Sequence, residues 1–92
     1  MADYAKAKGY QQLTSLAAAT ALTIPAGTSF AMLNAETQDV RWRDDGTDPT
    51  ATVGMLIAAG ATLTYEAADL AVMKFIQSAA SAKLNISYYG RS

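Results

Sequence analysis

The sequence predicts an all-β domain, a small sandwich or jelly-roll-like fold of seven to eight short antiparallel strands, with an extended N-terminal arm. Three observations support this class. Short runs alternate apolar and polar residues with the period of two that a half-buried strand requires. Turn-forming residues separate these runs, as in PAGT, DDGTDP and AAG. The only tryptophan, Trp42, lies in one of the alternating runs, where burial in a core is favoured over a role in ligand stacking.

The polar segment 1–12 is expected to form an arm outside a single β-sandwich domain at 13–92. Its isolated aromatic residues, Tyr4 and Tyr10, are candidates for contacts with a neighbouring subunit; a frayed terminus is the alternative. Residues 13–21 are rich in alanine, which favours a helical turn. Because this segment continues directly into strand-like sequence, we favour an extended conformation.

The rest of the first half is expected to contain alternating strands around a tight turn. Residues 22–24 alternate, and in the turn at 25–28 proline sets φ while glycine supplies a positive φ. Residues 30–34 are apolar on both faces, which is typical of a strand in the centre of a sheet. A further strand is expected at 38–43, the segment that holds Trp42.

The second half begins with an aspartate- and glycine-rich turn at 44–49 and continues with four runs that are expected to be strands. Gly54 marks a bulge or close-packing point in the first of these runs. Lys74 is the lone charge of a densely apolar run, and the last run alternates regularly. The four strands are expected at residues 51–57, 62–66, 70–77 and 82–89.

A weak internal similarity suggests that the chain consists of two related halves. The segment IPAG at 24–27 matches IAAG at 57–60, and the same offset aligns Trp42 with Phe75. Two copies are too few for a solenoid but fit the two halves of one sandwich. The aligned apolar positions are therefore expected to anchor the core, namely Phe30, Trp42, Leu63, Phe75 and Ile86.

Composition favours a protein that assembles. Hydrophobic residues make up 51% of the 92-residue chain, but many are alanines, which bury little apolar area each. Charged residues are only 16%, which suits a surface partly covered by neighbours, so a homo-oligomer is expected. The net charge of −1 with no basic stripe argues against a nucleic-acid partner. No run has membrane-spanning length, so no membrane partner is expected, and the sequence predicts synthesis in the cytoplasm.

The residues needed for most catalytic sites are missing. With no histidine and no cysteine, catalytic triads and thiol–metal sites are excluded, so neither an enzyme nor a cofactor is predicted. Asp44, Asp45 and Asp48 surround a glycine, which suggests a calcium loop as one interpretation. The turn lacks the spacing and the distal glutamate of an EF-hand, so a solvated turn is favoured, no metal site is assigned, and calcium binding stays open.

Two pairs of residues are candidates for contacts with other proteins. Arg41 and Arg43 should point away from the face that carries Trp42. They serve either as partner contacts or as outward charges balanced by the neighbouring aspartates, and for an assembling protein these alternatives weigh equally. Tyr88 and Tyr89 lie on opposite faces of the last strand, so one ring should be buried. The outward ring, assigned to Tyr89, is a contact candidate.

The run LTIPAGTSFAMLNAETQDVRWRDDGTDPTATVGMLIAAGATLTY, followed by LAVMKFIQSAASAKLNISYY, resembles small virion-associated proteins of tailed bacteriophages. The features that carry the resemblance are VRWRDDG, the pattern P-T-A-x-x-G and the closing LNISYY, and it covers about residues 20–90.

The resemblance implies a structural role on the virion. A capsid decoration, or cement, protein would bind the capsid exterior and brace the head, with the major capsid protein as its partner. It would be made in the host cytoplasm and carried on the capsid surface. The alternative is a component of the tail, a fibre or the head–tail junction that acts as a binding module. The resemblance brings no catalytic residues.

Overall fold

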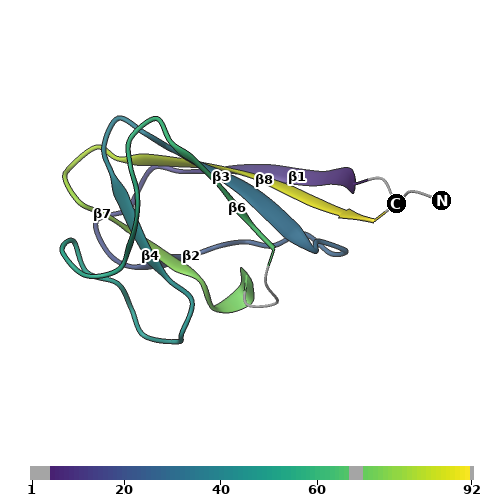
Figure 1. Cartoon of the computed structure of the whole chain (residues 1–92), viewed down its shortest axis with the longest axis horizontal. Helices are drawn as coiled ribbons and strands as arrows, with labels where there is room; N and C mark the ends of the chain where they lie inside the picture. Colours follow the sequence, from purple (N-terminus) through teal and green to yellow (C-terminus); the bar gives the residue numbers. More distant parts are fainter. Residues whose placement is uncertain (1–4, 67–69, 92) are drawn as a thin grey trace.

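Eight strands in two four-stranded antiparallel sheets form the framework of the computed structural model, which describes residues 5–66 and 70–91. The expected all-β class is confirmed. We call the sheet with strand order β1-β8-β3-β6 sheet A and the sheet with order β2-β7-β4-β5 sheet B. In Figure 1 the strands of sheet A lie together along the top, with β2, β4 and β7 of sheet B below them. Within the described residues no helix is long and apolar enough to span a membrane.

The strands are short except for those at the two ends of the chain. Sheet A consists of β1 (Ala5–Leu13), β8 (Lys83–Arg91), β3 (Phe30–Glu36) and β6 (Thr62–Tyr65). Sheet B consists of β2 (Thr20–Ala21), β7 (Lys74–Gln77), β4 (Val40–Arg43) and β5 (Met55–Ile57). A 3₁₀ turn, η1 (Leu70–Val72), precedes β7.

The strand pairing follows a nested pattern around the middle of the chain. β4 pairs with β5, β3 with β6, and β1 with β8, while β2 neighbours β7, so successive nested pairs alternate between the two sheets. Two further pairings, β3 with β8 and β4 with β7, join these pairs into sheets. The arrangement is compatible with the jelly-roll-like sandwich expected from the sequence. It leaves β1 and β6 at the edges of sheet A, and β2 and β5 at the edges of sheet B.

The core lies between the two sheets and alternates large and small side chains. Ala31 on β3 pairs with Tyr88 on one side and Tyr65 on the other, so an alanine separates two buried tyrosine rings. Tyr88 is 1% exposed and its hydroxyl donates to Gln11 Oε1 at 2.7 Å. The largest fully buried side chains are Tyr88, Phe75, Leu16, Leu33, Met73, Leu84, Ile86 and Val40.

Four of the five expected core anchors contact the core, and one does not. Phe75 and Ile86 are fully buried, while Trp42 and Leu63 are partly buried and pack against the core. The expectation for Phe30 is wrong. It lies on the outer face of sheet A because β3 turns Ala31, Leu33 and Ala35 inward, where Ala31 fits between Tyr65 and Tyr88. Trp42 and Phe75, which the internal similarity aligns, are cross-strand partners in sheet B.

The segment expected to form an N-terminal arm is extended, but its described part belongs to the domain. Residues 5–12 lie in β1, which pairs with β8 along its whole length, with a bulge between Ala7 and Gly9. Its polar composition reflects an edge strand with one face toward solvent. The boundary at residue 12 is therefore corrected, because residues 5–12 form part of sheet A. Tyr4 lies outside the described residues.

Two other expected strands are shorter than the sequence suggests, and a third is not formed. Of the run 51–57 only Met55–Ile57 forms a strand, and Leu70–Val72 of the run 70–77 forms the 3₁₀ turn. Residues 14–19 are irregular, between the end of β1 and the two-residue β2, and residues 22–24 form no strand, although Leu22 and Ile24 pack against the core. Leu16, Leu22 and Ile24 thus contribute to the core without lying in a strand.

Candidate functional site

The β4–β5 loop, residues 44–54, is held against sheet B by Arg41. The Arg41 guanidinium donates from Nε to the Ala51 carbonyl at 3.2 Å and from Nη1 to the Gly54 carbonyl at 2.9 Å. Gly54 has a φ of +142°, and a Cβ there would lie only 3.1 Å from the Trp42 carbonyl oxygen. The loop reaches this position because residue 54 is glycine. Arg41 is thus engaged within its own chain.

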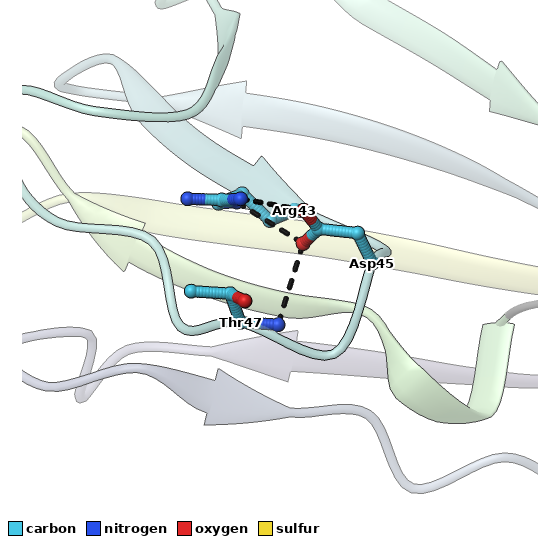
Figure 2. A network of polar contacts seen from close by, with 3 residues as sticks. All are labelled: Arg43, Asp45 and Thr47. Carbon is cyan, nitrogen blue, oxygen red and sulfur yellow. Dashed lines mark hydrogen bonds and ion pairs between the residues drawn. The ribbon is translucent and has the colours of Figure 1, made fainter.

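A second contact to the same loop starts at Arg43. Figure 2 shows its guanidinium paired with the Asp45 carboxylate, which also accepts a hydrogen bond from the Thr47 amide at 3.3 Å. The hydrogen bond from Arg43 lowers the pKa of Asp45 below its usual value, and the same contact raises the pKa of Arg43. Asp45 is exposed and Arg43 is partly exposed, so the pair fixes the local turn and contributes little to stability.

The three aspartates of the turn have three different partners. Asp45 pairs with Arg43, Asp48 pairs with Lys74 Nζ at 3.0 Å, and Asp44 accepts the Tyr65 hydroxyl. Each carboxylate is directed to a separate neighbour, so the turn links β4, β6 and β7. Within the described residues, no cluster of three or more aspartate or glutamate side chains is placed to hold a metal ion.

The outer face of sheet A lies on the opposite side of the molecule and is formed by uncharged side chains along most of its length. Among the residues whose side chains the structure describes, the strand register places the following outward: Ala7, Tyr10, Gln12, Phe30, Met32, Asn34, Glu36, Thr62, Thr64, Lys83, Asn85, Ser87 and Tyr89. Of these described side chains, only Glu36 and Lys83 are charged, and they are cross-strand partners at one end of the face. We refer to this set as the outer face of sheet A.

A belt of polar side chains crosses this face. Asn85 Oδ1 accepts hydrogen bonds from the Tyr10 hydroxyl at 2.5 Å and from Gln12 Nε2 at 2.9 Å, both on β1. Asn85 Nδ2 donates to Glu36 Oε1 at 2.8 Å, and more weakly to Asn34 Oδ1 at 3.4 Å, both on β3. Asn34 in turn donates to the Ala61 carbonyl just before β6. The belt links side chains of β1, β8 and β3 to one another and reaches the backbone just before β6.

Aromatic rings occupy the other parts of the same face. Phe30 and Tyr89 are cross-strand partners, and their rings stack with centroids 5.2 Å apart and an interplanar angle of 18°. Tyr10 is 65% exposed. The face therefore combines stacked aromatic rings with amides that already have partners, a composition common in protein-binding surfaces.

A third surface lies where β5 and β6 form neighbouring edges of the two sheets, and we call it the open edge. Val53, Met55 and Leu56 are 53%, 61% and 48% exposed. Met55 and Leu56 line a cleft of about 310 Å³, together with other residues of β5, β6 and their connection and with Trp42. The indole packs edge-to-face on Tyr65, with ring centroids 5.7 Å apart, and leaves part of its surface in the cleft.

The structure divides the predicted contact residues between two surfaces. Tyr10 and Tyr89 come together on the outer face of sheet A, whereas Arg41 and Arg43 bind the chain's own loop. Sequence reasoning missed the open edge, although Met55-Leu56-Ile57 is an apolar run without a protecting charge. It also missed Asn34 and Asn85, which occupy the polar positions of predicted strands. Comparison of the chain with protein-family models, curated proteins and solved structures gives no match.

Proposed function

We propose that this chain is a structural virion protein of a tailed bacteriophage, a capsid decoration protein that binds the major capsid protein on the head exterior. The observation that carries the proposal is the open edge, with three exposed apolar side chains, two of which, Met55 and Leu56, line a cleft that also contains Trp42. The resemblance of residues 20–90 to small phage virion proteins supports this class of partner. The role is non-catalytic, and the protein is made in the host cytoplasm and carried on the capsid surface.

The chemistry of the open edge favours a protein partner in an extended conformation. Edge strands of soluble proteins are commonly protected by charges or proline, because their unpaired backbone groups accept further strands. β5 has the sequence Met-Leu-Ile and carries no such protection. A segment of the capsid protein that adds alongside β5 would gain main-chain hydrogen bonds, and its side chains would fill the cleft beside Trp42.

The expected affinity of one such contact is modest. Complete burial of one large apolar side chain contributes about 1.5–3 kcal/mol. Val53, Met55 and Leu56 are each about half exposed, so their burial contributes roughly 3 kcal/mol together, before the costs of association. A decoration protein that binds through this edge therefore needs many sites on the shell, or more than one contact per assembly.

The test is an add-back experiment with heads that lack this protein. Wild-type protein should bind these heads at many sites and raise the temperature at which they release DNA. Met55→Glu and Leu56→Glu each place a charge on the open edge and should reduce binding by about tenfold or more, because the carboxylate would be buried against an apolar partner. Bound protein is measured by co-sedimentation.

The matched control is Ala26→Glu, which adds the same charge at an exposed turn residue on a different part of the surface. It should bind like the wild type, and circular dichroism should show that all variants are folded. Equal binding by the Met55 and Leu56 variants would contradict a role for the open edge. Binding to tails instead of heads would support the alternative, a tail or fibre module.

A further inference from the structure

The outer face of sheet A has a strand register that makes it self-complementary. β8 and β3 are the two central strands, and their paired residues form rows across the sheet. Lys83 pairs with Glu36, Asn85 with Asn34, Ser87 with Met32, and Tyr89 with Phe30. The rows thus combine opposite charges, two amides, a small with a large side chain, and two aromatic rings.

A two-fold axis parallel to the strands, placed between β8 and β3, would stack two copies of this face. Such an axis preserves the height of each residue along the strands and exchanges the two sides of the sheet, so each β8 residue would oppose the β3 residue of its own row in the second copy. Aligned packing keeps the strand directions of stacked sheets within about 30° of each other, so the rows stay opposed near the centre.

We propose that two copies of this chain associate through the outer face of sheet A about this axis. Lys83 of each copy then faces Glu36 of the other, and the Tyr89 ring faces Phe30. Side-chain sizes also alternate, since Met32 faces Ser87 and the exposed Tyr10 on β1 faces Thr64 on β6. Large side chains opposite small ones allow two sheets to interdigitate.

The charges at the end of the face support a second copy as the occupant. Lys83 forms no ion pair with any residue in the described part of the chain, and Glu36 accepts a hydrogen bond from Asn85. The dimer gives each lysine a carboxylate partner. Exposed ion pairs contribute little affinity, so the two pairs mainly set the relative position of the copies.

The size of the face fits a weak dimer. Four strands at ~4.8 Å spacing and a seven-residue central strand cover roughly 20 Å by 23 Å, or about 460 Å² in plan, and side-chain relief adds to this area. The lower end of specific interfaces is about 600 Å² per partner, so the contact lies at that limit. By contrast, part of sheet B is occupied by the β4–β5 loop, so sheet A offers the larger continuous surface.

The dimer would place the two open edges on opposite sides, because the axis sets β6 of one copy over β1 of the other. A dimer of this kind could bridge two capsid subunits. This bridging supplies the second contact that is needed because one open edge binds with only modest affinity. The inference deepens the proposed function and rests on it for this bridging role. The association itself is measured without capsids, so a failure to dimerise would not refute capsid binding, and a failure to bind capsids would not refute the dimer.

The experiment compares two single charge reversals, alone and mixed, by sedimentation equilibrium over a range of concentrations. Wild type should approach twice the 9.7 kDa chain mass. Glu36→Lys alone makes the end of the face entirely positive in a dimer, and Lys83→Glu alone makes it entirely negative, so each should weaken association by about tenfold or more. The equimolar mixture should form dimers again, because each positive face then meets a negative one.

Recovery in the mixture shows that the charges act between copies. An effect of the substitutions on the cross-strand pair within one chain would persist, because mixing changes nothing inside either chain. Met32→Arg at the centre of the face provides a second variant and should give monomers with an unchanged circular dichroism spectrum. A wild-type protein that stays monomeric at millimolar concentration, a mixture that fails to recover, or a dimer that persists in Met32→Arg would each overturn the proposal.

Discussion

Substitution of Gly90 by alanine should destabilise the fold more than any other glycine-to-alanine change in the described chain. Gly90 lies near the end of β8, where the turn at residues 25–28 crosses the strand. A Cβ on residue 90 would lie 1.9 Å from the Gly27 carbonyl oxygen and 3.0 Å from its carbon. These atoms belong to the backbone, so no side-chain rotation relieves the contact and the turn itself must move.

The cost follows from what holds the turn in place. The Ser29 amide donates to the Tyr89 carbonyl at 2.8 Å, and the displaced turn loses this hydrogen bond, a loss of about 1 kcal/mol. Overpacking adds about 1–3 kcal/mol. Alanine recovers about 0.5–1 kcal/mol, because it loses less conformational entropy on folding than glycine. The net loss is about 2 kcal/mol, or roughly 10–15 °C in Tm for a chain of this length.

Urea denaturation measures the effect, with an unchanged slope expected because the surface exposed on unfolding stays the same. The matched control is Gly46→Ala, whose Cβ would meet nothing within 4 Å but whose φ is +85°. That variant should lose only about 1 kcal/mol, from backbone strain. If Gly90→Ala loses no more than Gly46→Ala, the 25–28 turn does not lie against β8 and the reasoning fails.

Three further outcomes follow from particular contacts. Burial raises the pKa of Tyr88 from 10.0 to about 12, so the buried neutral hydroxyl contributes of the order of 2 kcal/mol to the free energy of unfolding below pH 10, and this contribution is lost as the pH rises toward 12. In urea titrations the free energy of unfolding of Tyr88→Phe should therefore decline less steeply above pH 10 than that of the wild type, and an identical decline would contradict this. Arg41→Lys cannot reproduce the two hydrogen bonds to the 44–54 loop, so amide exchange there should accelerate by about tenfold, whereas unchanged exchange would show that Arg41 does not hold the loop. Thr37 has a φ of 76°, so Thr37→Gly should stabilise the protein by up to about 1 kcal/mol in thermal unfolding, and a loss of stability would refute backbone strain at this turn.

Alternation in the sequence was enough to predict the fold class and most strands, because a half-buried sheet imposes a period of two on side chains. It could not determine which face of an apolar strand points inward. β3 carries Phe30 and Met32 on one side and Ala31 and Leu33 on the other, and both sides look buried. The choice depends on Tyr65 and Tyr88, which flank Ala31 in space but are distant in sequence.

The candidate surfaces were predicted less completely than the fold, for a similar reason. Tyr10 and Tyr89 could be named as contact residues, but their common face depends on the pairing of β1 with β8. Arg41 and Arg43 have partners in the 44–54 loop, and this folding back depends on the backbone at Gly54. Isolated strand patterns carry no information about which edges stay unpaired, so Met55 and Leu56 emerged only with the topology.

Cryo-electron microscopy of the intact phage particle tests the central proposal most directly, by locating density for this domain. Decoration predicts many copies on the outer shell, with the open edge at β5 against the capsid protein and sheet A of neighbouring copies in contact. A few copies at one vertex or along the tail, or no copies on the purified virion, would contradict it.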